Sequence, residues 1–282
     1  MTTQPTGQEQ TQGCHELARR GQCPECDDEY ERLAGHWKGS CGPPTLDRRQ
    51  RTLIAGLLLG DGHVGGNGEN KHFQLSTRWR PFARWVFAEL AWLAARMVRI
   101  TDAREERRPP AQHYVVRTHA HPALSRFRGW YHRSEDRGDA AAGESPDTKQ
   151  LPAPADLPGG GLTSRMGRAW HATAGSLAWS APKYPTTRQA SFSAEADARA
   201  ERVMALLESV GLEPTRVGKR VQLPPKETTG LFDWIGTDPV PGVAYKWAAD
   251  HEEYRNAKCD AEALRARLWY ERATRTGGND GS

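Results

Sequence analysis

The sequence lacks any run of about 18 apolar residues, the length at which a helix becomes a candidate to cross a membrane. Its first thirteen residues are polar and contain no apolar core, so they do not resemble a secretory signal. Cysteine is scarce: the chain has five, and four of them lie between residues 14 and 41. This crowding is typical of metal binding in a reducing compartment rather than of a disulfide framework. We therefore expect a cytoplasmic protein with no membrane partner.

Negative charge is absent from one long stretch: no Asp or Glu occurs from Leu162 through Ala194. The net charge of the whole chain is only +4, with a pI near 8.8, which permits nucleic acid as a partner without requiring it. Most of the positive charge is arginine, whose planar fork suits phosphate and guanine. The 282 residues are enough for two core-bearing units or one large one.

One apolar segment, Leu53–Gly62 (LIAGLLLGDG), predicts a buried helix that ends on a carboxylate. Gly56 and Gly60 lie four apart on one face, where the missing side chains let another helix approach closely. Each glycine costs about 1 kcal/mol relative to alanine, so close packing has to compensate. Asp61 follows at the negative end of the helix dipole, a place that attracts a cation. An ordinary core helix with an Asp-Gly turn is the alternative.

A cysteine cluster precedes this helix. Cys23-x2-Cys26 and His36-x4-Cys41 are separated by nine residues, which gives four ligands suited to a closed, tetrahedral, structural Zn²⁺ site. Unrelated thiols in a polar loop are the alternative. Cys14 lies outside this spacing and Cys259 lies in a polar C-terminal segment, and the role of each is open.

The glycine-bearing helix resembles the signature helix of the LAGLIDADG homing endonucleases. The cysteine cluster looks like the zinc module that precedes this helix in some members. Tyr114–Leu124, Leu231–Gly236 and Pro239–Trp247 are similar to the ends of the two halves of that family. The resemblance covers roughly residues 20 to 250. It implies an α+β fold in which two pseudo-symmetric αββα units pack through their signature helices, and a monomer that acts as a pseudo-dimer.

A weak internal repeat agrees with two units. Aligning Gly62 with Gly175 places Gly56 over Ala169 and Gly60 over Thr173, so small residues four apart recur on both helices. We predict a disordered tail (1–19), a zinc-finger-like module (20–44), a first unit (45–133), a linker (134–161), a second unit (162–250), and a C-terminal helix and tail (251–282). Predicted strands span 70–78, 114–118, 188–193 and 216–223, and predicted helices span 82–93, 124–131, 162–174, 196–210 and 228–235.

The resemblance implies one acidic residue from each signature helix and Mg²⁺-dependent hydrolysis of phosphodiesters. Asp61 matches the first position as a catalytic residue and Mg²⁺ ligand, but the second position is Ala174. His171 and Thr173 are poor ligands for a hard metal. Three explanations are open: a degenerate element that still binds DNA; an enzyme that cuts one strand, or cuts slowly, with metal on Asp61; or a misaligned site that a distant carboxylate, Asp233 or Asp250, completes.

Basic and polar residues are also implied near the DNA. Lys246 matches a lysine of the family's Tyr-Lys-Trp run, so the resemblance implies a catalytic basic residue near the reacting phosphates. Arg117 is its loose counterpart in the first half. For each of them, a solvated basic residue at the end of a strand is the alternative. Alternating polar strand positions predict that a β-ribbon reads base edges in the major groove, although only one alternating set can face the DNA. The candidate DNA-binding residues are Gln74, Ser76, Arg78, Arg117, Arg188, Gln189, Ser191 and Ser193.

We interpret the sequence as a sequence-specific double-stranded DNA-binding protein of the homing endonuclease type. Its Mg²⁺-dependent cleavage is expected to be weakened or lost because Ala174 replaces the second acidic residue. A catalytically silent DNA-binding regulator or an RNA maturase on the same fold is the alternative, and an unrelated globular enzyme is a third. The target sequence, and an origin in an intron, an intein or a free-standing mobile gene, are not encoded in any pattern we recognise.

Overall fold

A computed structural model gives the fold of the chain. It describes residues 13–18, 21–30, 33–39, 41–66, 71–102, 111–130, 149–179 and 187–276. Residues 1–12 of the predicted tail and 134–148 of the predicted linker lie outside the described residues. No helix in these ranges combines the length and the apolar character that a membrane-spanning segment needs.

The first unit begins with the glycine-bearing helix. Its elements are α2 (Arg48–Leu59), β4 (Gly62–Gly65), β5 (His72–Thr77), α3 (Arg80–Glu89), η1 (Ala91–Leu93), β6 (Ala94–Asp102), β7 (Ala111–Thr118) and the 3₁₀ helix η2 (Pro122–Trp130). A capping box starts α2, because the Asp47 side chain accepts a hydrogen bond from the Gln50 N–H at 2.6 Å and the Gln50 side chain accepts one from the Asp47 N–H at 3.2 Å. The predicted strands 70–78 and 114–118 are confirmed as β5 and β7.

The second unit repeats this plan. Its elements are α4 (Ser164–Ala174), β8 (Gly175–Trp179), β9 (Arg188–Ser193), α5 (Asp197–Glu208), β10 (Thr215–Val217), β11 (Arg220–Gln222), α6 (Pro225–Ile235) and η5 (Ala244–Trp247). The antiparallel strands follow the order β10-β11-β9-β8, which matches β6-β7-β5-β4 of the first unit. The α+β fold with two pseudo-symmetric units is therefore confirmed. The single strand predicted over 216–223 is a hairpin instead, because Gly218 has a φ of 57° and turns the chain.

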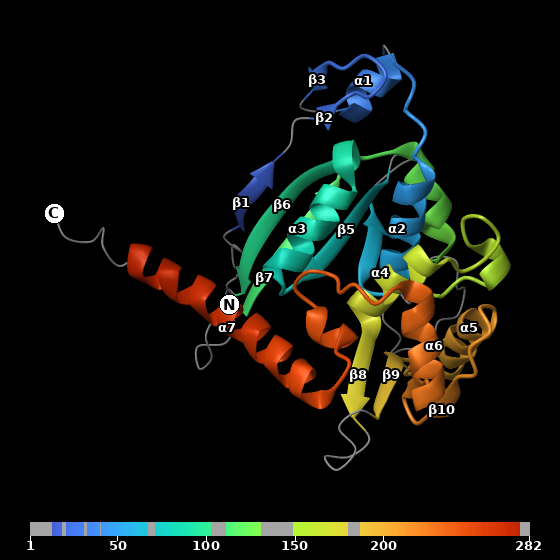
Figure 1. Cartoon of the computed structure of the whole chain (residues 1–282). Helices are drawn as coiled ribbons and strands as arrows, with labels where there is room; N and C mark the ends of the chain where they lie inside the picture. The colour runs from blue at the N-terminus through green and yellow to red at the C-terminus, as the bar shows by residue number, and fades with distance from the viewer. Residues whose placement is uncertain are drawn as a thin grey trace, which may run out of the picture.

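The two units meet through α2 and α4, which lie side by side between the two sheets (Figure 1). A Cβ built on Gly56 would lie 2.4 Å from the carbonyl oxygen of Met166 and 2.9 Å from the Cβ of Ala169. A Cβ on Gly60 would lie 1.8 Å from the Oγ1 of Thr173. The predicted packing of the two helices through small residues is confirmed: Gly56 meets Ala169, Gly60 meets Thr173, and the two backbones touch where side chains are missing.

Two predictions about the connections are wrong in part. Gly13–Ala18 was expected in the disordered tail, but it forms strand β1, which pairs antiparallel with β6 and makes the first sheet five-stranded. Strand β6 itself was not predicted, and its nine residues present a free edge that β1 covers. The end of the predicted linker is packed rather than loose, because Leu151 and Leu157 are buried in the main core around the short 3₁₀ helix η4 (Pro154–Asp156).

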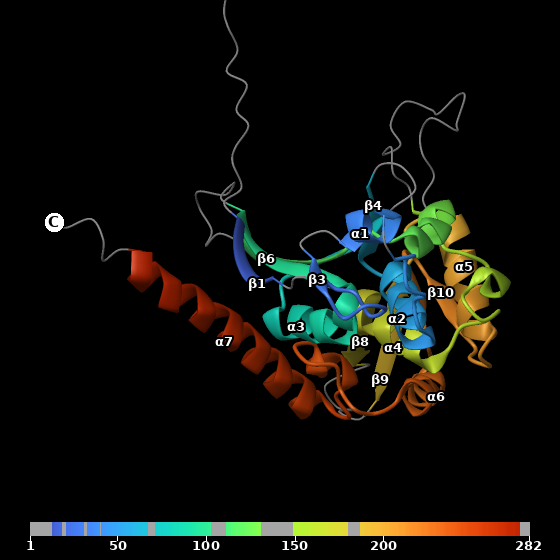
Figure 2. The same ribbon diagram turned by 90° about the horizontal axis from the view of Figure 1, so that it is seen from above.

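The ends of the chain add two peripheral elements. The cysteine segment forms β2 (Gly21–Gln22), β3 (Glu29–Tyr30) and α1 (Leu33–Gly39), and it sits beside one end of the first unit (Figure 1). The C-terminal helix α7 (His251–Thr276) packs its first turns near η5 and then projects away from the body (Figure 2).

The close contact predicts an unusual response to adding a methyl group. Gly56→Ala should lower the free energy of unfolding by about 1–3 kcal/mol, because the added Cβ meets the backbone of Met166, which cannot rotate away. In α6, Gly230 is the matched control, since its added Cβ would meet only the Leu212 side chain at an ordinary 3.4 Å. Gly230→Ala should raise stability by up to about 1 kcal/mol through helix propensity. Denaturant unfolding of both variants checks this, and equal shifts would contradict the interface.

Candidate functional site

The carboxyl ends of α2 and α4 come together at the boundary of the two units. A Cβ on Gly60 would lie 3.3 Å from the backbone nitrogen of Ala174, so the two predicted positions of the acidic pair are neighbours. Asp61, the residue directly after Gly60, is exposed and lies at this junction. The junction therefore carries one carboxylate where the resemblance implies two.

Each of these helix ends is capped by a lysine. The Nζ of Lys246 donates to the carbonyl oxygens of Ala172 at 2.8 Å and of Thr173 at 3.1 Å. In the first unit, the Nζ of Lys149 donates to the carbonyl oxygens of Gly60 and, at 3.1 Å, of Gly62. Ammonium groups satisfy the unpaired carbonyls and the negative dipole at helix C-termini. Lys149, which no local sequence pattern selects, is thus the counterpart of Lys246.

The charges around Asp61 are mostly positive. Partial loss of solvent at the junction raises the pKa of Asp61 above its ordinary value, and Lys246, Lys149 and Arg199 oppose that rise. The same loss of solvent lowers the pKa of Lys246 to about 8 and that of Lys149 to about 7, with Asp61 acting in the opposite direction on both. The cations outnumber the single carboxylate, so the junction attracts anions more than it attracts a divalent cation.

A cleft of about 260 Å³ opens beside Asp61, and it is lined in part by Arg78, His113, Tyr245 and Lys246. Among the described residues that line this cleft, Asp61 is the only carboxylate. Mg²⁺ prefers several oxygen ligands in octahedral geometry, and the nearby helix-end carbonyls already accept hydrogen bonds from lysines. The donor set therefore does not fit a carboxylate-paired Mg²⁺ site.

The other residues considered as ligands are directed elsewhere. Thr173 donates its hydroxyl to the Ala169 carbonyl at 3.1 Å. Asp250 accepts from the Glu253 N–H at the start of α7, and Asp233 acts on the pKa of Arg188 rather than on that of Asp61. Neither distant carboxylate lines the cleft. The idea that one of them completes the site has no support in the described residues.

His171 is a core residue. Its ring is fully buried between Phe192, Phe232 and Trp247, and burial lowers its pKa to about 3, so the ring is neutral. The Nε2 of His171 lies 3.1 Å from the Lys246 carbonyl oxygen, which fixes η5 against the last turn of α4. His171 thus helps to hold the segment that carries Lys246.

One face of the first sheet is polar. In β5, His72, Gln74 and Ser76 alternate with the buried Phe73 and Leu75, so the predicted residues Gln74 and Ser76 lie on the polar face. Arg117 in β7 joins them, since its Nε and Nη2 donate to the Gln74 Oε1 at 3.1 and 2.5 Å. Arg78 is exposed just after β5 and lies over the Trp79 ring. Sequence reasoning missed four members of this face, one from each strand: His63, His72, Arg96 and His113. In β6, Val98 and Ile100 follow Arg96 on the same face, so that strand has no polar alternation to read.

The other predicted DNA-binding residues lie on two opposite faces of the second sheet. Arg188 was expected to bind DNA, but it lies on the core side, where it stacks on Phe232 and donates to the Ala248 carbonyl at 2.7 Å. That expectation is wrong, because a period of two puts Arg188 on the same side as Ala190 and Phe192. Gln189, Ser191 and Ser193 share the opposite side, although Ser191 is only 3% exposed. Three further members of this side were missed: Ser176, Arg220 and Gln222.

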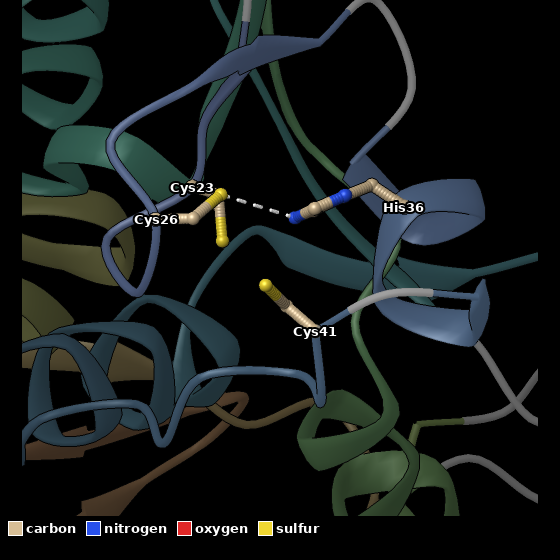
Figure 3. Close-up of side chains that lie close together, drawn as sticks. All are labelled: Cys23, Cys26, His36 and Cys41. Carbon is tan, nitrogen blue, oxygen red and sulfur yellow. Dashed lines mark hydrogen bonds between the residues drawn. The ribbon is translucent and has the colours of Figure 1, made fainter.

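The four predicted zinc ligands converge (Figure 3). The ligand atoms of Cys23, Cys26, His36 and Cys41 all lie within 4.8 Å of one another. Burial acts to raise the pKa of the Cys23 thiol, but hydrogen bonds from the backbone of Glu25 and Cys26 stabilise the thiolate and bring the pKa to about 7. Three thiolates and one imidazole are typical ligands of structural Zn²⁺, so the cluster fits this metal. Cys14 lies in β1, and Cys259 is exposed on α7.

The cysteine segment is docked on the first unit by aromatic side chains. Trp37 of α1 packs edge-on against Trp92 of η1, with ring centroids 5.8 Å apart, and against His121 at 5.1 Å. His121 also contacts the Pro44 carbonyl at 2.8 Å through its Nε2. A metal in this segment would therefore stabilise its position on the main body.

Comparison with known proteins supports the fold. No protein-family model matches the sequence, and no curated protein matches it. The solved structure of the homing endonuclease I-WcaI bound to its DNA recognition sequence matches with a TM-score of 0.60 and 14% identity, over 77% of this chain and 92% of that one. The LAGLIDADG homing endonuclease I-GzeII in complex with its DNA target matches with a TM-score of 0.38 and 10% identity, over 82% and 98%, and adds no weight. The chain has the fold of a homing endonuclease, as the resemblance implied.

The cysteine cluster makes a direct prediction. About one zinc ion per chain should purify with the protein, because thiolate sites bind zinc tightly at neutral pH. Cys26→Ser should lose the zinc and release Trp37 from Trp92, which a change in tryptophan fluorescence would report. Cys259→Ser is the matched control and should keep both properties, since Cys259 is exposed on α7. Elemental analysis that finds no zinc under reducing, chelator-free conditions would refute the site.

Proposed function

We propose that this protein binds double-stranded DNA through the polar faces of its two sheets. The observation that carries the proposal is the pair of matching faces that two pseudo-symmetric units present. On the first face, the pKa of His72 is lowered by burial and then by its neighbours, which include two arginines and a lysine: Arg117, His63, Arg96 and Lys71. Such a face suits a polyanion, and its hydrogen-bonding side chains suit the edges of bases in the major groove.

The fold supports the same proposal. The solved homing endonuclease with which the chain shares its fold is described as bound to its DNA recognition sequence. In this chain, the two helix ends that carry Asp61 and Ala174 lie between the two units. DNA that contacted both sheets would cross this junction. There, Lys149, Lys246 and Arg199 lower the pKa of Asp61 through their positive charge. These cations suit the phosphates of a bound duplex.

We further propose that cleavage is weakened, because one carboxylate replaces the expected pair. The charge balance at the junction favours weakened cleavage over full activity, because lysines already donate hydrogen bonds to the carbonyl oxygens at both helix ends. A catalytically silent DNA-binding regulator is the second candidate, and the same charge balance favours it. An RNA maturase on the same fold would differ by preferring structured RNA over duplex DNA.

Binding to DNA is tested by its salt dependence. Affinity for duplex DNA should fall by about a thousandfold or more between 50 and 200 mM salt, because several arginines and lysines displace condensed counterions. Fluorescence anisotropy with a long random duplex measures this. Without measurable duplex affinity at 50 mM salt, the proposal fails, and tight binding to a structured RNA in the same assay would favour the maturase.

The missing carboxylate is tested by restoring it. Ala174→Asp should raise Mg²⁺-dependent cleavage of a bound duplex by about tenfold or more, since even outer-shell partners of a metal change its affinity by that amount. Without metal, the variant should be less stable than wild type, because two carboxylates would then face each other at the helix ends. Gel assays of wild type, Ala174→Asp and the double variant Asp61→Ala/Ala174→Asp measure cleavage. Fast cleavage of both strands by wild type would contradict the proposed weakening.

A further inference from the structure

Four side chains form a row across the polar face of the first sheet. The strand registers align His63 of β4 with Gln74 of β5, Gln74 with Arg117 of β7, and Arg117 with Arg96 of β6. We call His63, Gln74, Arg117 and Arg96 the first row. Neighbouring strands lie about 4.8 Å apart, so the row runs across the sheet as a continuous line of polar groups.

The second sheet has an equivalent row of different chemistry. The pairing of Gly62 with Leu75 in the first unit corresponds to that of Gly175 with Phe192 in the second. Counting from these pairs gives a second row with no charged member: Ser176, Ser191, Gln222 and Thr215. Gln222 therefore occupies the position of Arg117, and Ser191 occupies that of Gln74.

From this difference we infer that Arg117 reads guanine and that Gln74 is its positioning residue, so the two halves of the DNA site differ in base preference. The inference rests on the proposed DNA binding. Beyond that binding, it specifies the chemical identity of one base and an asymmetry between the two halves of the site.

The hydrogen bonds of Arg117 define which donors remain. The Nε and Nη2 of Arg117 both donate to the Oε1 of Gln74, at 3.1 and 2.5 Å, so one side of the guanidinium is fixed. The two terminal nitrogens still carry N–H groups that point away from this bond. A terminal arginine fork matches the O6 and N7 acceptors of guanine, which is the commonest specific contact in the major groove. Gln74 uses its oxygen on Arg117, so its amide N–H groups also remain as donors.

The charges around Arg117 agree with a ligand that only accepts hydrogen bonds. Burial lowers the pKa of Arg117, and Arg96 lowers it further; within the part of the chain that the structure describes, no carboxylate contributes to this shift. Arg188, on the core side of the second sheet, contrasts with this, because Glu253 and Asp233 raise its pKa against the effect of burial. The first row thus presents the donor groups of Arg117, Arg96 and Gln74, with no described carboxylate contributing to the pKa of Arg117. Adenine offers a donor at the position of the guanine O6, so it fits this row poorly.

The second row cannot make the same selection. The Oγ of Ser176 and the Oγ of Ser191 lie 2.8 Å apart and bond to each other, and Ser191 is only 3% exposed. Gln222 has both a donor and an acceptor, and it lies beside Thr215, which is exposed. A row of this kind accepts more than one base. We therefore place the guanine contact of this row under the first sheet. Arg220 lies two residues before Gln222 on the same face of the second sheet, outside the row, so it would meet a different base pair.

The test is a selection of bound sequences from a randomised duplex pool by the full-length protein. Wild type should enrich guanine at one position in one half of the site. Arg117→Lys keeps the positive charge but loses the planar fork, so it should retain salt-dependent binding and lose the guanine enrichment by about tenfold or more. Gln74→Ala should reduce the enrichment partly. Gln222→Ala, at the equivalent position in the second unit, is the matched control: it should change the bases selected in the second half only and keep the guanine enrichment of the first half.

The outcomes separate this inference from the proposed function. If wild type binds no duplex, the proposed function fails and takes the inference with it. If wild type binds but Arg117→Lys keeps the same guanine enrichment, DNA binding stands and the role of Arg117 is refuted. Guanine enrichment at the equivalent position of the second half, under Gln222, would also refute the inference. Thermal unfolding of each variant checks that it is folded. If Arg117→Lys does not fold, Arg117→Ala tests the same position in its place.

Discussion

Contact between two helix backbones, without side chains between them, is the constraint on which the rest of this structure depends. Gly56 and Gly60 permit it, since a Cβ at either position would lie less than 3.0 Å from atoms of α4. Because the helices touch, their carboxyl ends are brought to one place and the two sheets are held as equivalent halves. The polar faces, the junction and the cleft beside Asp61 all follow from that contact.

Bringing two helix C-termini together has an electrostatic cost. Each end carries unpaired carbonyls and the negative end of a dipole, and Asp61 adds a full negative charge at the same place. Lys149 and Lys246 offset this by donating to the carbonyls of the two ends. The lysines come from segments that follow the last strand of each unit, so the neutralisation is built symmetrically into the fold. With this arrangement, the junction is stabilised by ammonium groups and does not need a metal to hold the helices together.

The sequence predicted the parts of the fold that strong local patterns specify. The glycine spacing predicted that α2 and α4 pack against each other through small residues, and alternation predicted β5, β7 and β9. Strands β1 and β6 were missed because their stability comes from pairing with each other and with β7, which a local pattern does not record. Lys149 was missed for a similar reason: it stands 88 residues after Asp61, and only the folded chain brings it to α2. The wrong prediction for Arg188 shows the same limit. Composition indicates that a strand carries polar residues, but only the strand register determines which of them lie on the outer face of the sheet.

A single chain with two units can change one half without changing the other. Here the two halves keep the same strand order, but only the first unit carries β1 and the docked cysteine segment, and only its row contains arginine. In a true dimer of identical subunits, every such addition would occur twice and the target would have to be a palindrome. The pseudo-dimer removes that requirement, because each face evolves its own hydrogen-bonding groups while α2 and α4 keep the halves in register. If the proposed DNA binding holds, differences between the faces are therefore the features of this protein that carry information about its target, and the shared core carries none.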